Sequence, residues 1–181
     1  MPNSILTVEQ KLLLNQIREE IKIGLPGEEA QNKLAPISSK SKYRIAPDNH
    51  KKACVMSLIY PEGNELRMAF IERTFSHPED KHGGQISFPG GKLEEEDDTL
   101  LIGALREVEE EIGIPSDQIS ILGQLTDLYV FASNFMVYSF VGHMERSPKF
   151  IPQESEVASI VSFPINRLLT AEIIDTKDLQ V

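Results

Sequence analysis

The stretch over residues 91–114 constrains the fold of this chain more than any other part of its 181 residues, because it holds a helix with two marked ends. Asp98 and Thr99 supply side chains that can cap a helix start. Gly113 followed by Pro115 supplies a stop. The residues between these signals are good helix formers, so the sequence predicts a helix over about residues 99–112.

This helix has two chemically different faces. At about 100° per residue, its apolar side chains fall within an arc of roughly 140° that is expected to pack on a core: Leu100, Leu101, Ala104, Leu105, Val108 and Ile112. Glu107, Glu110 and Glu111 cluster on the adjacent face, where Gly103 leaves room. Like charges three or four residues apart destabilise a helix unless cations neutralise them. Hard divalent ions such as Mg²⁺ prefer oxygen ligands, so the pattern indicates a metal site; the alternative is a solvated acidic face.

At these residues the sequence resembles the Nudix hydrolase family, whose motif ends in Arg-Glu-hydrophobic-any-Glu-Glu-any-Gly-hydrophobic. Residues 106–114 match all nine of these positions. The front half differs, because Gly91 lies fifteen residues before Arg106 instead of fourteen and Asp98 stands eight before Arg106, where the motif has Glu. The resemblance implies an α+β fold, an α/β/α sandwich with a mixed β-sheet on which the motif helix packs.

A longer match resembles the coenzyme A (CoA) pyrophosphatase branch of that family. Residues 82–91, HGGQISFPGG, match the pattern that precedes the motif in this branch through ten residues. The branch is also similar in having one extra residue between the motif glycine and the motif arginine, and in carrying Asp at the position of Asp97. Farther upstream the likeness weakens, because Asp80 stands where the branch has Arg, with Lys81 beside it.

The resemblance implies a function as well as a fold. It predicts hydrolysis of the CoA diphosphate to 3',5'-ADP and 4'-phosphopantetheine with Mg²⁺ or Mn²⁺, because such ions orient the substrate, polarise phosphoryl oxygens and lower the pKa of bound water. Two alternatives stay open. One is a Nudix hydrolase of another nucleoside diphosphate derivative, such as ADP-ribose, a dinucleotide or a nucleoside triphosphate. The other is a non-catalytic module that binds a nucleotide.

The metal-binding candidates lie in the motif itself. Glu107 and Glu111, one helical turn apart, are the leading ligands, with Glu110 as a third ligand or as the group that orients water. Arg106 is expected to hold a glutamate in its ligating rotamer, with a surface ion pair as the alternative. Gly91 is expected to turn its carbonyl toward the metal in a backbone conformation that a Cβ would resist.

The other candidates lie in predicted loops. Glu156 precedes a predicted strand, where related enzymes carry an acidic group that reaches the metals; it is the candidate general base, or else a solvated loop residue. Arg73, Lys81 and His82 are candidate substrate-binding residues for the 3'-phosphate of CoA. Asn134 is a further substrate-binding candidate, in an aromatic segment that offers a surface for adenine or, alternatively, packs in the core.

Composition limits the partners. A formal net charge of −10 disfavours nucleic-acid binding but admits a small nucleoside diphosphate, since bound metal can invert the local field. Cys54, the only cysteine, is expected to be a buried structural thiol. The sequence shows no signal segment and no apolar run of bilayer length, so we expect a cytoplasmic protein without membrane contact. A homodimer stays open.

Outside the motif the pattern is α+β within one domain. Residues 1–50 are expected to form a helix at 6–23, capped by Thr7, and then a loop at 27–49, both packing on a Nudix domain at 51–181. The apolar side of this helix is assigned to Leu12, Leu13, Ile17 and Ile21. A short helix is expected at 165–169. Strands are predicted by alternation and β-branched content near residues 53–60, 66–72, 119–125, 135–143 and 157–163.

Overall fold

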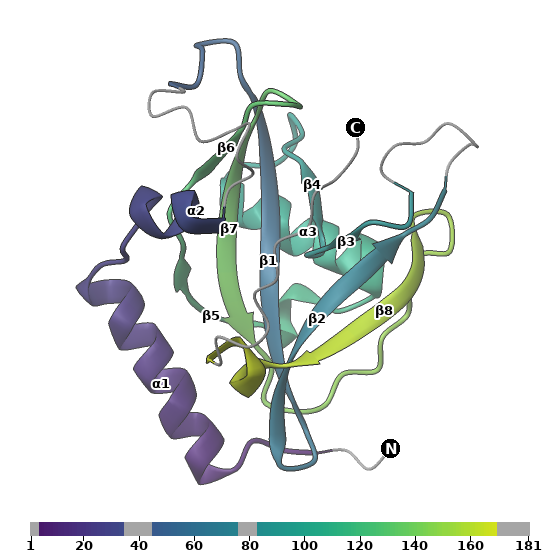
Figure 1. The fold of residues 1–181 in the computed structure, drawn as a ribbon. Coiled ribbons are helices and arrows are strands. Elements are labelled where there is room, and N and C mark those ends of the chain that lie inside the picture. Colours follow the sequence, from purple (N-terminus) through teal and green to yellow (C-terminus); the bar gives the residue numbers. More distant parts are fainter. Residues whose placement is uncertain (1–3, 35–44, 76–82, 170–181) are drawn as a thin grey trace.

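The computed structural model describes residues 4–34, 45–75 and 83–169, and it shows a twisted mixed sheet with helices packed around it (Figure 1). The strands are β1 (Lys51–Glu62), β2 (Glu65–Arg73), β3 (Ile86–Ser87), β4 (Gly90–Lys92), β5 (Ser120–Gln124), β6 (Leu128–Val130), β7 (Phe135–His143) and β8 (Val157–Pro164). Their order is β3-β2-β1-β7-β5, while β4 pairs with β1, β6 with β7 and β8 with β2. β1 and β7 run parallel and the other pairs antiparallel, so the predicted mixed sheet is confirmed.

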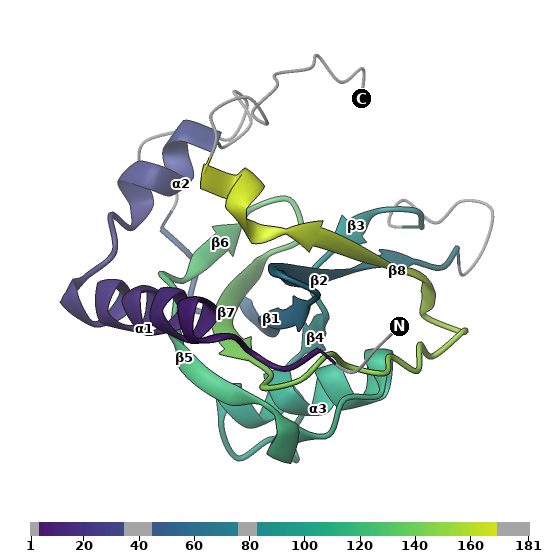
Figure 2. The ribbon, with the colours of Figure 1, turned by 90° about the horizontal axis from the view of Figure 1, so that it is seen from below.

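The helices are α1 (Val8–Ile23), α2 (Glu28–Leu34) and α3 (Leu100–Ile112), with 3₁₀ turns η2 (Ser116–Gln118) and η3 (Ile165–Leu169). α1 and α3 lie on different sides of β1 (Figure 2). Alternate residues of a strand point to opposite faces, and β1 follows this rule. Met56 and Leu58 pack in the core cluster beneath α3, whereas Ile59 packs with Leu14 of α1. None of the helices within the described ranges is long and apolar enough to cross a bilayer.

The motif helix forms where it was predicted. Thr99 is its N-cap, and the Thr99 hydroxyl accepts a hydrogen bond from the Ile102 N–H at 3.2 Å. Gly113 ends the helix in the left-handed region, at φ 71°. The predicted apolar face is buried, because Ala104, Val108 and Ile112 are fully shielded from solvent. The other face is therefore aimed away from the core, toward β4.

α1 confirms the predicted cap but corrects one predicted contact. Thr7 and Gln10 form a capping box, in which each side chain accepts from the backbone N–H of the other. Leu14 is buried, and Leu13 is half-buried against the same cluster. Leu12 is 60% exposed, so its assignment to the apolar side was wrong. The helix rests on the sheet by a narrower stripe than the sequence pattern suggested.

Several short elements were not predicted. Residues 28–34, expected as loop, form α2, whose acidic first turn and basic last turn suit the helix dipole. Gln31 fastens α2 to the body of the protein by donating to the carbonyls of Thr126 and Asp127 at 3.0 and 3.2 Å. β3, β4 and β6 contain two or three residues each. Such strands are too short to show an alternating pattern in the sequence.

Candidate active site

Glu111 is the most deeply buried carboxylate of the site. Its side chain is 2% exposed. One carboxylate oxygen, Oε2, accepts a hydrogen bond from the Gly90 N–H at 2.8 Å. The other, Oε1, lies 3.7 Å from Nη1 of Arg73. α3 thus places this predicted metal ligand against the start of β4 and the end of β2.

Glu107 lies one turn earlier on α3, against Gly91. A Cβ at Gly91 would stand 2.4 Å from Oε1 of Glu107, closer than real Cβ contacts come. Gly91 itself is not in a left-handed conformation; Gly90 is the strained neighbour, at φ +150°. The expected backbone reason for a glycine at 91 was therefore wrong. Glycine is needed there because the Glu107 carboxylate occupies the space of a side chain.

Gly90 and Gly91 lie in β4, a short strand that the sequence did not predict. β4 pairs with the first half of β1, so that Gly91 is opposite Cys54. A Cβ at Gly90 would stand 2.3 Å from the Cys54 carbonyl oxygen. Cys54 is buried, as predicted, and burial raises its pKa to about 11. This thiol is therefore protonated at neutral pH, which agrees with a structural role.

Arg106 is the centre of a charged network. Its Nε and Nη2 donate to the two oxygens of Asp97, both at 3.0 Å. Its Nη1 donates to Oε1 of Glu107 at 3.1 Å and to Oε2 of Glu110 at 2.8 Å. The network extends well beyond the surface ion pair that was the alternative reading of Arg106. Arg106 holds the Glu107 carboxylate in place while Asp97 holds Arg106.

Asp97 is the buried member of the otherwise exposed turn at residues 94–98. Its side chain is 2% exposed, and its Oδ2 also accepts from the Glu94 N–H at 2.9 Å. Hydrogen bonding to Arg106 lowers the pKa of Asp97, so that this carboxylate is firmly ionised. Gly103 provides the room, as expected, because a Cβ there would come within 3.0 Å of Asp97.

The electrostatics of the site favour a bound cation. Burial raises the pKa of Glu111 to about 7, against the opposing hydrogen bond from Gly90, and the charge of Glu107 adds to the increase. Burial also raises the pKa of Glu107, against the opposing charge of Arg106. Two neighbouring carboxylates that resist ionisation form a site where a positive ion would stabilise their charged forms.

Glu156 lies at the edge of this cluster. The loop that carries it is tied to the end of α3, because the Ile151 and Gln153 N–H groups donate to the carbonyls of Ile112 and Glu111 at 2.9 and 3.0 Å. It is tied to β2 because the Thr74 N–H donates to the Glu156 carbonyl at 2.8 Å. The Glu156 side chain is exposed. Its charge adds to the raised pKa values of Glu107 and Glu111.

The predicted substrate-binding residues do not all lie at this carboxylate cluster. Arg73 contacts Glu111, as described above. Asn134 lies in the turn before β7 at φ 57°, where its Oδ1 accepts from the Tyr129 hydroxyl at 2.9 Å and its Nδ2 donates to the Asn49 carbonyl at 3.3 Å. Its amide is engaged in holding this turn. Lys81 and His82 lie outside the described residues.

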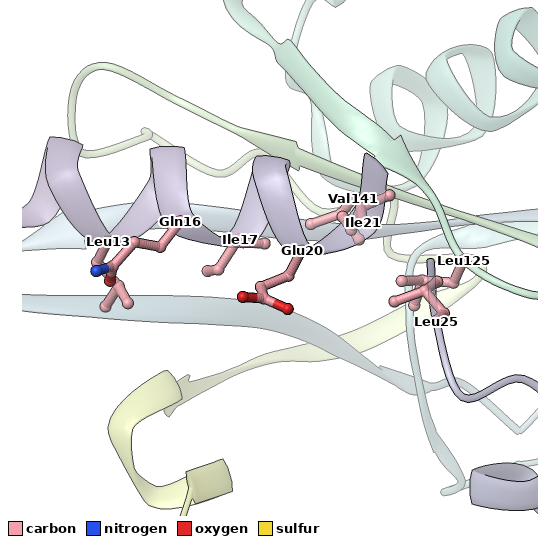
Figure 3. Close-up of a pocket in the computed structure, with 8 residues that line it drawn as sticks. All are labelled: Leu13, Gln16, Ile17, Glu20, Ile21, Leu25, Leu125 and Val141. Atoms are coloured by element: carbon pink, nitrogen blue, oxygen red, sulfur yellow. The ribbon is translucent and has the colours of Figure 1, made fainter. Parts of the chain in front are cut away.

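A pocket separate from the carboxylates of α3 lies between α1 and the sheet (Figure 3). It has a volume of about 460 Å³. Its lining is mainly apolar, including Leu13, Ile17, Leu125 and Val141, and Glu20 is the charged residue that lines it. A single carboxylate in an apolar wall offers fewer oxygen ligands for a divalent ion than the cluster on α3, so the carboxylates of α3 mark the candidate active site.

Comparison with known proteins agrees with this geometry. The family model described as the NUDIX domain matches residues 50–179, most of the chain and all of the described site. The chain belongs to the Nudix family.

Two Nudix hydrolases named NudL, both described as uncharacterized, are similar to it. That of Yersinia enterocolitica is 42% identical over 89 residues, which cover 49% of this chain and 45% of the relative. That of Yersinia pestis is 38% identical over 90 residues, which cover 50% and 45%. The match spans less than half the length of either relative.

Solved Nudix structures share the fold at low sequence identity. The NUDIX domain of Shewanella oneidensis NrtR, complexed with ADP ribose, is 16% identical with a TM-score of 0.53, over 75% of this chain and 87% of that chain. A binary complex of the C. elegans Ap4A hydrolase is 13% identical with a TM-score of 0.54, over 65% and 83%. At such identities the likeness shows the fold alone.

Nudix hydrolases generally use divalent metal ions, and the residues present fit such an ion. The donors are carboxylate oxygens, which hard cations prefer, and the missing Cβ at Gly91 makes room for one of these carboxylates, that of Glu107. Within the part of the chain that the structure describes, no three His, Cys, Asp or Glu side chains already converge on one point. Arg106 binds one oxygen of Glu107 and one of Glu110, so the second oxygen of each carboxylate could ligate an ion while the guanidinium holds the first.

Proposed function

We propose that this protein hydrolyses the diphosphate of CoA, or of a CoA derivative, with Mg²⁺ or Mn²⁺, giving 3',5'-ADP and 4'-phosphopantetheine. The observation that carries the proposal is the pair of carboxylates Glu107 and Glu111, whose side chains are 12% and 2% exposed and face Gly91 and Gly90. Arg106 holds Glu107 by a hydrogen bond of 3.1 Å. Such a pair is unfavourable unless a cation binds it, so its presence is better explained by catalysis than by stability.

In the proposed reaction, water attacks one phosphorus of the diphosphate. A P–O bond to the bridging oxygen breaks, and that oxygen leaves with the other phosphate. A bound divalent ion supplies positive charge to the phosphoryl oxygens and lowers the pKa of a coordinated water. Glu107 and Glu111 would hold the ion, with Glu110 and the Gly91 carbonyl as further ligands, and Glu110 alternatively orients the water.

Proton removal is assigned to Glu156. Its loop is fastened to both α3 and β2, and its exposed carboxylate can accept a proton from the attacking water without a large desolvation cost.

Arg106 contributes to the proposed reaction indirectly, by positioning the carboxylates that would bind the ion. Because Asp97 binds two of its nitrogen atoms, Arg106 keeps a fixed position from which it orients Glu107 and Glu110.

The choice of CoA is supported by sequence, through the resemblance of residues 82–91 to the CoA pyrophosphatase branch. The alternatives stay open, and two proteins that share the fold illustrate them: one is complexed with ADP ribose and the other is named an Ap4A hydrolase. Their 16% and 13% identity shows the fold alone and does not choose a substrate. The non-catalytic alternative would be supported by loss of a motif glutamate. Glu107, Glu110 and Glu111 are all present, which favours an enzyme.

A panel of diphosphates tests the proposal. CoA, dephospho-CoA, ADP-ribose and a dinucleotide are incubated with the protein and Mg²⁺, Mn²⁺ or a chelator, and products are identified by mass spectrometry. A charge-assisted contact to the 3'-phosphate contributes about 1.5–3 kcal/mol. We therefore expect kcat/KM for CoA to exceed that for dephospho-CoA or ADP-ribose by roughly tenfold or more, and Lys81→Ala to narrow the gap.

The panel also separates the alternatives. Equal kcat/KM for CoA and ADP-ribose would remove the CoA assignment and leave a general Nudix diphosphatase. Binding of nucleotides without hydrolysis of any member of the panel would point to the non-catalytic module. Hydrolysis that continues undiminished in the chelator would contradict the metal requirement.

A further inference from the structure

Arg73 lies beside Glu111 at the end of β2, next to a bulge in that strand. The pairing of β2 with β8 shifts register between Glu72 and Arg73, and a bulge of this kind re-aims the side chains beside it. The backbone of Arg73 is fixed, because its N–H donates to the Gln85 carbonyl at 3.0 Å and its carbonyl accepts from the Gly84 N–H at 2.8 Å. The guanidinium therefore extends from a rigid strand end.

The contact made by this guanidinium is loose. Nη1 of Arg73 lies 3.7 Å from Oε1 of Glu111, beyond hydrogen-bond length, and the Arg73 side chain is 36% exposed. Arg106, the other guanidinium at the site, is bound to Asp97, Glu107 and Glu110 at 2.8–3.1 Å. Of these two arginines, Arg73 is the one that can turn to a ligand without breaking a short ion pair among the described residues.

We infer that Arg73 binds the diphosphate of the substrate and not its 3'-phosphate, an inference that rests on the proposed function. The guanidinium lies beside Glu111, a proposed metal ligand, so an oxygen of the bond to be cleaved comes within its reach. The 3'-phosphate stands across the ribose from that bond. A guanidinium offers a planar fork that suits phosphoryl oxygens, and it would exchange a loose contact with Glu111 for short hydrogen bonds to the substrate.

The kinetic test uses Arg73→Gln and Arg73→Lys with CoA and dephospho-CoA as a matched pair of substrates. Loss of a charge-assisted phosphate contact lowers kcat/KM by roughly ten- to a hundredfold. We expect Arg73→Gln to lower it by the same factor for both substrates, and Arg73→Lys to recover part of the loss by restoring the charge. A loss confined to CoA would overturn the inference and return Arg73 to the 3'-phosphate.

A binding test separates this inference from the choice of substrate. Inorganic pyrophosphate has a diphosphate and no nucleoside, and its affinity in the presence of Mg²⁺ is measured by calorimetry without any turnover. Arg73→Gln is expected to weaken pyrophosphate binding by roughly tenfold or more. This result would stand even if CoA proved not to be hydrolysed. Unchanged affinity would overturn the inference and leave Arg73 as a counter-ion of Glu111.

Arg67→Gln is the matched control, because Arg67 lies on the same strand and away from the carboxylates of α3. It pairs with Glu62 and Glu65 at 3.0 and 2.9 Å and donates to Ser162. Its loss is expected to lower the melting temperature and to leave pyrophosphate affinity unchanged. Equal weakening of pyrophosphate binding by Arg67→Gln and Arg73→Gln would mean that the effect comes from damage to β2, and would overturn the inference.

Discussion

The Glu111 carboxylate works against the stability of the protein in the absence of metal. Its pKa is raised to about 7 from an ordinary value of 4.5, so the folded state binds this proton more tightly than the unfolded state. Its charge therefore lowers the free energy of unfolding. This penalty is absent below about pH 4.5, grows as pH rises toward 7, and is complete above that value.

Glu111→Gln tests whether the charge of Glu111 lowers the free energy of unfolding. In metal-free buffer at pH 8 the variant is expected to be more stable than the wild type, by up to about 3 kcal/mol, measured by urea unfolding. The advantage should shrink as pH falls from 7 and vanish near 4.5. Glu109→Gln, at an exposed position on the same helix, should show no such trend. A Glu111→Gln protein that is less stable than the wild type at every pH would refute the stated environment of this group.

α3 and β4 act as one unit, in which each glycine of β4 serves a carboxylate of α3. Gly90 donates to Glu111, and Gly91 leaves space for Glu107. The sequence predicted α3 well, because its caps and apolar spacing are local signals. It did not predict the buried position of Asp97 or the strand conformation of Gly90 and Gly91, because these depend on contacts with residues distant in the chain.

Gly91→Ala is expected to lower kcat on the order of a hundredfold, the scale for loss of a key catalytic group, because the new Cβ displaces the Glu107 carboxylate. The melting temperature should change less. Gly123→Ala is the control, since a Cβ there meets Ile21 of α1 at 2.6 Å, on the opposite side of the sheet. It should lower the melting temperature and spare the rate. A Gly91→Ala enzyme with full activity and a lowered melting temperature would show that Gly91 is only a structural residue.

The described residues form one core cluster under each of the two main helices, and the carboxylate cluster lies on the α3 side. Alternation and β-branched content predicted β7 at its true bounds, and β1, β2, β5 and β8 to within two residues at each end. The identity of the motif carboxylates was also predictable, because helical spacing fixes their face. The contact between Arg73 and Glu111 was not, because it depends on a bulge in β2 that has no sequence signal here.

The central claim is that the carboxylates of α3 bind a divalent ion, and a Mn²⁺ titration tests it most directly. The signal of free Mn²⁺ is followed by electron paramagnetic resonance with the wild type, Glu107→Gln, Glu111→Gln and Glu109→Gln. We expect the wild type and Glu109→Gln to bind with the same Kd, and the other two to bind roughly tenfold or more weakly. The same Kd for all four proteins would contradict the assignment of the metal site to Glu107 and Glu111.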